Sequence, residues 1–159
     1  MRILIVGGWK KADFIAKSLT DKKHELIIIH DDFEYCKWLS RKYNIPVICG
    51  DGSDPDILEE ANIKEFDIVL ALTPKDEDNL AICKIAKENF FIKRAFSIVG
   101  NPKNVDIFKK FGVDNVISST YVVSNIIEQV ATVKEIENYI PLDNGQVGLM
   151  EILLKKEYF

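Results

Sequence analysis

The sequence predicts an α/β fold: a Rossmann-like, doubly wound sheet of six parallel strands in the order 3-2-1-4-5-6, followed by a C-terminal crossover helix. Two observations support this prediction. Short apolar runs rich in β-branched residues alternate with segments of helical periodicity, and Gly7-Gly8 stands directly after the first run. Strands that alternate with helices form parallel βαβ units, because each helix returns the chain to the same edge of the sheet.

The first βαβ unit occupies the first thirty residues. Residues 2–6 and 26–29 are its two apolar runs, and Phe14, Ile15 and Leu19 recur between them at helical spacing. In such a unit, backbone N–H groups and the helix dipole converge on phosphate at the strand-to-helix turn. The usual fingerprint G-x-G-x-x-G/A is written here as GGWKKA, with tryptophan in place of the second glycine.

The later elements continue the alternation. Helices are predicted over residues 32–43, 54–61, 76–89 and 101–111, and strands over 45–49, 66–72, 95–99 and 115–118. Asp54-Pro55 suits a helix start, Gly112 suits a helix end, and the strand over 66–72 is apolar enough to be buried on both faces. In this strand order the ligand crevice lies at the carboxyl ends of the first and fourth strands.

The last forty residues follow a different pattern. Residues 119–140 predict a long amphipathic helix with more apolar positions than one sheet edge requires. Pro141 and Asn144-Gly145 then break the chain, and residues 147–154 predict one more strand without a partner in the sheet. We therefore divide the chain into a Rossmann-like domain (1–118), a crossover and dimerisation helix (119–140), and a linker with an extra strand toward a further C-terminal domain (141–159).

Composition narrows the class of function. The 159 residues carry a formal net charge of −4, which gives no sign of nucleic-acid binding. Cys36, Cys49 and Cys83 form no C-x-x-C pair, so we expect reduced, buried thiols in a cytoplasmic protein. No apolar stretch approaches the roughly 20 residues that span a bilayer, and no signal-peptide layout precedes the first strand. Any membrane association is therefore expected through a partner.

Four groups of residues carry a family resemblance. They are residues 2–7 with 16–19 (AKSL); residues 50–55 (GDGSDP) with 58–61 (LEEA); residues 71–73 (ALT) with 76–77 and 79–80; and residues 101–102 with 111–114 and 116–118. Through them the sequence resembles, over roughly residues 1 to 135, the N-terminal nucleotide-sensing domain of Trk-type potassium-uptake regulators, the RCK or KTN domain.

The resemblance implies a regulatory protein and not an enzyme. Such proteins lie at the inner face of the membrane as homodimers or larger homo-oligomers on a potassium transporter or channel, and respond to NAD(H), ATP, ADP or AMP. By position, the candidate cofactor-binding residues are Gly7, Gly8, Trp9, Lys10, Lys11, His30, Asp31, Gly50, Asp51, Gly52, Leu72 and Thr73. Neither catalytic residues nor a metal site is expected.

Three positions depart from the family pattern where a dinucleotide would make contact. Trp9 replaces a glycine, His30 replaces the acidic residue that binds ribose hydroxyls, and Ile98 stands where NAD-binding members commonly have arginine. The indole of Trp9 is expected either to fill the pocket or to swing outward as a lid over a smaller ligand. The site is thus predicted to be changed or abandoned, and in the second case the chain is a nucleotide-free dimerisation module.

The candidate residues also have plain structural interpretations. Lys10 and Lys11 can be solvated charges, Asp51 can be a turn former, and the acidic run that begins at Asp76 is favoured by a helix start without any metal. An NAD-dependent oxidoreductase is disfavoured, because no tyrosine is followed four residues later by lysine and the predicted fold includes no substrate domain.

Overall fold

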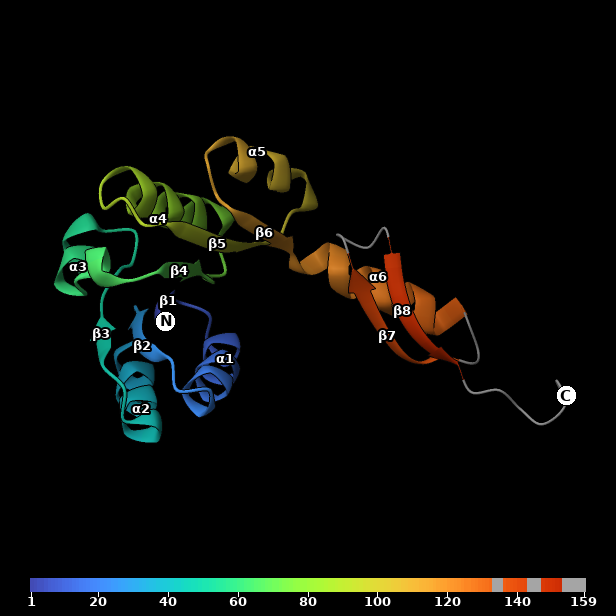
Figure 1. Cartoon of the computed structure of the whole chain (residues 1–159), viewed down its shortest axis with the longest axis horizontal. Coiled ribbons are helices and arrows are strands. Elements are labelled where there is room, and N and C mark those ends of the chain that lie inside the picture. Colours follow the sequence, from blue (N-terminus) through green and yellow to red (C-terminus); the bar gives the residue numbers. More distant parts are fainter. Residues whose placement is uncertain (133–135, 143–146, 153–159) are drawn as a thin grey trace, which may run out of the picture.

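The computed structural model of the chain describes residues 1–132, 136–142 and 147–152. Its main sheet is parallel, in the order β3-β2-β1-β4-β5-β6, which confirms the predicted topology (Figure 1). The strands are β1 (Arg2–Val6), β2 (Glu25–His30), β3 (Val47–Cys49), β4 (Ile68–Ala71), β5 (Arg94–Val99) and β6 (Asn115–Ser118). The helices between them are α1 (Lys10–Asp21), α2 (Phe33–Tyr43), α3 (Pro55–Glu60), α4 (Asp76–Glu88) and α5 (Val105–Lys110), with short 3-10 helices η1 (Ile63–Glu65) and η2 (Pro102–Asn104).

Helices cover both faces of the sheet, so its central strands are apolar on both sides. Along β1, Ile3 and Ile5 pack toward α1 and α2, whereas Leu4 and Val6 belong to the core beneath α3, α4 and α5. This alternation follows from the two-residue period of a strand. Figure 1 shows α1 and α2 on one side of the sheet and α3, α4 and α5 on the other.

Strand register brings the candidate residues to one level. Val6 of β1 pairs with Ile29 of β2 and with Ala71 of β4, so these three strands end together. The helices that follow begin at local signals, as predicted: Asp32 caps α2 by accepting a hydrogen bond from the Tyr35 backbone N–H at 2.7 Å. The chain therefore enters each following element at the same carboxyl edge of the sheet.

The C-terminal part corrects the prediction for residues 119–140. Helix α6 (Ser119–Thr132) begins as expected, but residues 136–142 form strand β7 (Ile136–Leu142), which pairs antiparallel with β8 (Val147–Ile152). Pro141 disfavours helix at the residue before it, and Asn144-Gly145 is typical of hairpin turns. The predicted extra strand is confirmed over 147–152 with β7 as its partner, while residues 133–135 and 153–154 lie outside the described residues.

The cysteine prediction was wrong at one position. Cys36 and Cys83 are buried free thiols, but Cys49 is exposed. Cys49 ends β3, the outermost strand on one edge of the sheet, where only one neighbouring strand covers the backbone. The apolar run that includes Cys49 therefore belongs to an edge strand, which leaves its last side chain open to solvent.

Candidate functional site

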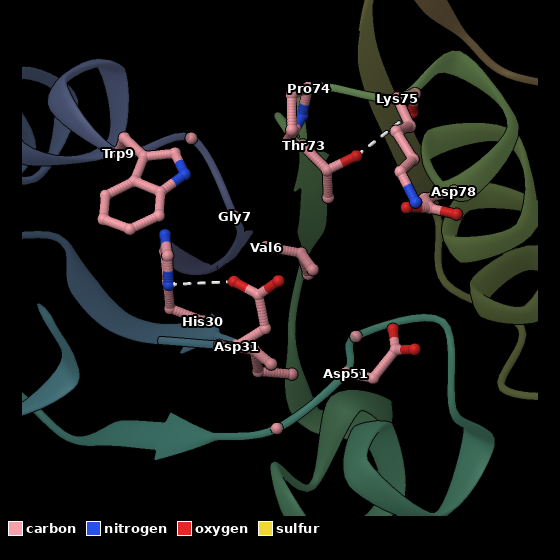
Figure 2. Close-up of a pocket in the computed structure, with 14 residues that line it drawn as sticks. Val6, Gly7, Trp9, His30, Asp31, Asp51, Thr73, Pro74, Lys75 and Asp78 are labelled. Atoms are coloured by element: carbon pink, nitrogen blue, oxygen red, sulfur yellow. Dashed lines mark hydrogen bonds and ion pairs between the residues drawn. The ribbon is translucent and has the colours of Figure 1, made fainter. Parts of the chain in front are cut away.

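A cavity of about 100 Å³ opens at the carboxyl ends of β1, β2 and β4. It is lined by Val6, Gly7, Gly8, Trp9, Ile29, His30, Asp31, Gly50, Asp51, Gly52, Thr73, Pro74, Lys75 and Asp78. Figure 2 shows Trp9 and His30 on one wall, Thr73, Lys75 and Asp78 on the opposite wall, and Asp51 between them. The structure thus brings most of the predicted site residues together.

The turn between β1 and α1 requires its two glycines. Gly7 has φ +70°, and a Cβ atom on it would lie 2.8 Å from Thr73 Cγ2; Gly8 has φ +101°, and its Cβ would lie 3.0 Å from Leu72 Cβ. Trp9 continues this conformation with φ 44° and ψ −122°, values that glycine adopts far more readily than a residue with a side chain. The tryptophan therefore occupies a position whose backbone conformation favours glycine.

The Trp9 side chain forms a wall of the cavity. Its ring centroid lies 4.5 Å from that of His30 in an edge-to-face arrangement and 4.9 Å from that of Tyr35. Trp38 stacks on the far side of Tyr35 at 5.4 Å. Trp9 remains 46% exposed. The indole thus lines the cavity without filling it and packs against the rings of His30 and Tyr35. Figure 2 shows it beside His30.

His30 is a buried, neutral imidazole. Its Nδ1 atom accepts a hydrogen bond from the Asp32 backbone N–H at 3.0 Å, and Asp31 Oδ1 lies 3.2 Å from the same nitrogen. Burial lowers the pKa of His30 below its ordinary value of 6.5, although Asp31 and Asp32 oppose this shift. The other ring nitrogen, Nε2, is buried and has no hydrogen-bond partner within the described part of the chain.

The loop after β3 approaches β1 closely. A Cβ atom on Gly52 would lie 2.1 Å from Val6 Cγ1, so only glycine fits beneath the end of β1. Asp51 Oδ1 accepts hydrogen bonds from the backbone N–H of Ser53 at 2.8 Å and from its hydroxyl at 2.7 Å. These hydrogen bonds lower the pKa of Asp51. The turn-forming interpretation of Asp51 is confirmed, and the same carboxylate lines the cavity.

The opposite wall is held by Asn79, a buried residue of α4. Its Oδ1 accepts hydrogen bonds from the backbone N–H and the hydroxyl of Thr73, both at 2.8 Å. Its Nδ2 donates to the carbonyl oxygens of Thr73 at 3.0 Å and Ile98 at 3.1 Å. Asn79 therefore fixes the position of Thr73 between β4 and α4. Sequence reasoning missed this role, although a polar residue amid the apolar positions of α4 was the available signal.

Asp76 explains the acidic start of α4. Its carboxylate accepts hydrogen bonds from the backbone N–H of Gly100 at 2.7 Å, the backbone N–H of Asn101 at 3.1 Å and Asn104 Nδ2 at 2.7 Å. Asp76 thus joins α4 to the loop after β5. Over residues 1–132, 136–142 and 147–152, no three His, Cys, Asp or Glu side chains form a group that could hold a metal ion.

Lys10, Lys11 and Leu72 do not line the cavity. Both lysines are exposed in the first turn of α1, and Leu72 is buried against Gly8. The lining residues that the prediction missed are Val6, Ile29, Pro74, Lys75 and Asp78. Val6 is the last residue of β1 and Ile29 the next-to-last residue of β2, and their position at these strand ends was a signal in the sequence. Lys75 and Asp78 reach the cavity through the conformation of the turn that enters α4.

The residues present fit an anionic group at the start of α1. Trp9, at the N-cap position, makes no side-chain capping hydrogen bond within the described chain. The Gly8 carbonyl accepts hydrogen bonds from the backbone N–H of Lys11 at 2.8 Å and of Ala12 at 3.3 Å, so the start of α1 offers its dipole and only part of its N–H groups to a ligand. His30 Nε2, which has no hydrogen-bond partner among the described residues, is a polar atom on the same wall. Lys75 adds one positive charge from the opposite side, whereas the carboxylates of Asp31, Asp51 and Asp78 line the same cavity and oppose an anion. A phosphate group is the ligand that such donors bind best.

Known proteins are similar to this chain in sequence and in fold. Residues 3–119 match the family model described as the TrkA-N domain. Over 155 residues the chain is 30% identical to the Trk system potassium uptake protein TrkA homolog of Methanothermobacter thermautotrophicus, covering 98% of this chain and 71% of that protein.

Two solved structures have the same fold. The GsuK channel bound to NAD superposes with a TM-score of 0.72 at 17% identity, covering 79% of this chain and 23% of that one. GsuK bound to ADP superposes with a TM-score of 0.74 at 18% identity, covering 82% of this chain and 34% of that one. This chain therefore corresponds to one domain of a longer protein in both structures.

Proposed function

The chain belongs to the TrkA-N domain family, and from this membership we propose that it is a regulatory, nucleotide-sensing part of a potassium transport system. In this role it binds NAD(H) or an adenine nucleotide and alters the activity of a membrane potassium transporter or channel. It acts at the cytoplasmic face of the membrane and makes or breaks no bond. The observation that carries the proposal is the cavity at the start of α1, lined by Gly7, Gly8 and His30.

The cavity supports a ligand that enters by displacing Trp9. Its volume of about 100 Å³ is below the roughly 300 Å³ at which small-molecule pockets usually begin. Trp9 is 46% exposed and belongs to neither hydrophobic core cluster, so we expect its side chain to rotate outward without opening the core. A nucleotide phosphate at the start of α1 and a ribose near His30 Nε2 would then occupy the enlarged site.

Helix α6 supports a homo-oligomer. Val123, Ile127 and Val130 are each more than half exposed, at the four- and three-residue spacing that places them along one side of a helix. A second copy of the chain would cover these side chains. We therefore include a homodimer, or a larger homo-oligomer built from it, in the proposed function.

A nucleotide titration tests the sensing role. With NAD, NADH, AMP, ADP or ATP at about 100 times its Kd, the free energy of unfolding should rise by about 2.7 kcal/mol, which raises Tm by roughly 5–10 °C. GMP and GTP are the matched control ligands. In a Trp38→Phe variant, Trp9 is the only tryptophan, so its fluorescence reports directly on movement at the cavity. A Tm shift together with a Trp9 signal supports the proposal.

The second candidate function is a dimerisation module that binds no nucleotide. The strained Trp9 at the glycine position favours it, because the indole narrows the cavity. If the chain is such a module, no nucleotide shifts the Tm of the wild type, but nucleotides raise the Tm of a Trp9→Gly variant. If neither protein responds to any of the five nucleotides, the sensing role is wrong for this chain.

The oligomer is tested by sedimentation. Ile127→Asp places a charge in the exposed stripe of α6 and should convert a dimer to monomer, whereas Glu128→Gln on the same helix should not. A wild type that sediments as a monomer at the highest concentration measured would contradict this part of the proposal.

A further inference from the structure

The positive charge of the chain is concentrated in the layer that α1 and α2 form on one side of the sheet. Residues 10–23 and 33–43, which are α1 with its following turn and α2, contain eight Lys or Arg and three Asp or Glu; the remaining sequence contains 13 and 22. This layer therefore has a formal charge of +5 in a chain whose total is −4. The even composition of the whole sequence conceals this separation.

Large aromatic side chains are exposed on the same layer. Phe14 of α1 is 76% exposed, and Phe33 and Trp38 of α2 are 59% and 44% exposed. The ammonium groups of two lysines lie over aromatic rings, Lys37 at 4.2 Å from the Phe33 centroid and Lys42 at 4.4 Å from the Trp38 centroid. Exposed aromatic rings covered by lysines are stable at a boundary between water and an apolar phase.

The two helices present one continuous surface. Lys10, Phe14 and Lys17 follow one another at intervals of four and three residues, so they share the side of α1 opposite the buried Ala12 and Ala16. Lys42 of α2 pairs with Asp13 of α1 at 2.7 Å, which joins the helices. Figure 1 shows them side by side, away from α3, α4 and α5. We call this the α1–α2 surface, comprising Lys10, Phe14, Lys17, Phe33, Lys37, Trp38, Arg41 and Lys42.

We propose that the α1–α2 surface docks directly onto an anionic phospholipid bilayer. Lysine and arginine would contact the lipid phosphates, and Phe14 and Trp38 would enter the headgroup region, where aromatic rings are favoured. The aromatic side chains project from the outer sides of helices, which suits a broad, soft interface, whereas single-stranded nucleic acid needs a basic groove in which bases stack.

This contact goes beyond the proposed function and does not depend on it. None of the helices in residues 1–132 or the two later described segments has the length and apolarity needed to cross a bilayer, so the contact is a surface one. It would hold the chain at the membrane without a transporter. The start of α1, where the cavity lies, is at one end of this surface, so the nucleotide site would face the lipid headgroups from the side.

Vesicle co-sedimentation tests the proposal with the full chain. Binding should be strong with vesicles of phosphatidylcholine and phosphatidylglycerol, weak with phosphatidylcholine alone, and reduced by salt. Lys17→Glu with Arg41→Glu should lower the partition coefficient at least about tenfold, because each basic residue near the surface contributes roughly a fivefold factor. Phe14→Ser with Trp38→Ser should also lower it about tenfold or more.

Matched controls come from the opposite layer. Lys109→Glu with Lys110→Glu, and Phe111→Ser, alter exposed residues at the end of α5 and should leave the partition coefficient within twofold of the wild type. Thermal unfolding of every variant verifies that it is folded. In a Trp9→Phe variant, emission from Trp38 should shift to shorter wavelength with phosphatidylglycerol vesicles.

Three results would overturn the proposal. The first is equal binding to neutral and anionic vesicles, or none to either, and the second is an equal loss in the α5 controls. The third is binding of a short single-stranded oligonucleotide or an acidic peptide to the α1–α2 surface, together with no binding of vesicles. Because no nucleotide ligand is present in these assays, failure of the docking leaves the sensing role to be judged by its own titration.

Discussion

The two walls of the cavity are built on different principles. The wall between β4 and α4, with Thr73, Lys75 and Asp78, is backed by Asn79 and Asp76, whose side-chain oxygen and nitrogen atoms all make hydrogen bonds to neighbouring segments. On the β1–β2 wall, Trp9 has a positive φ, and two buried polar atoms, His30 Nε2 and Tyr35 Oη, have no hydrogen-bond partner among the residues described. The first wall is a fixed frame, and the second retains unsatisfied groups.

This difference indicates which wall can respond to a ligand. A ligand shifts a protein between two states only if it binds them with different affinity. The β1–β2 wall offers such a difference, because moving the Trp9 side chain uncovers His30 Nε2, which has no partner among the described residues. Two of the three predicted departures from the family pattern, Trp9 and His30, lie on the wall that can change.

The largest expected effect is at Asn79. Asn79→Ala should lower the free energy of unfolding by about 3 kcal/mol, because the backbone N–H of Thr73 and the Ile98 carbonyl lose a buried partner. Asn89→Ala, at the exposed end of the same helix, should change it by less than about 0.5 kcal/mol. Urea titration of both variants measures the difference. Equal losses would mean that the β4–α4 wall is not the fixed frame.

Most of the fold could be predicted from the sequence because its signals are local and repeated. Apolar runs, helical spacing and start signals such as Asp32 and Asp54-Pro55 fixed the order of the elements and the sheet topology. The end of α6 could have been predicted as well, since Pro141 and Asn144-Gly145 indicate a hairpin. The prediction extended the helix beyond residue 132 to residue 140, although Pro141 and Asn144-Gly145, which follow, favour a strand and a turn there.

The site could be predicted only in part, because strand ends are visible in the sequence and side-chain directions are not. Gly7, His30 and Gly52 follow or approach the carboxyl ends of strands, and all three line the cavity. The position of Lys75 depends on the turn that Asn79 holds, and the outward or inward direction of Trp9 depends on packing against Tyr35. Such contacts join residues far apart in the sequence.

A smaller effect is expected at Trp9. Trp9→Ala and Trp9→Gly remove the same aromatic contacts, but only glycine relieves the backbone at φ 44°, ψ −122°. The glycine variant should therefore be more stable than the alanine variant by about 1 kcal/mol, even after its larger loss of chain entropy. Ser18, in the middle of α1, is the control position: there the alanine variant should be more stable than the glycine variant by about 1 kcal/mol. An alanine variant as stable as the glycine variant would show that residue 9 is unstrained.

The smallest expected effect is the pH dependence that His30 gives to stability. Its pKa is lowered in the folded protein, so below pH 6.5 the unfolded chain binds a proton that the folded chain does not. Stability should therefore fall as the pH drops from 7 toward 5, a range in which carboxylates with lowered pKa stay charged in both states. His30→Gln should remove this part of the slope. Asp31→Asn removes a charge that raises the pKa of His30. The stability of this variant should therefore continue to decline to a lower pH than the stability of the wild type. A wild-type slope unchanged by His30→Gln would mean that the β1–β2 wall holds no buried neutral imidazole in solution.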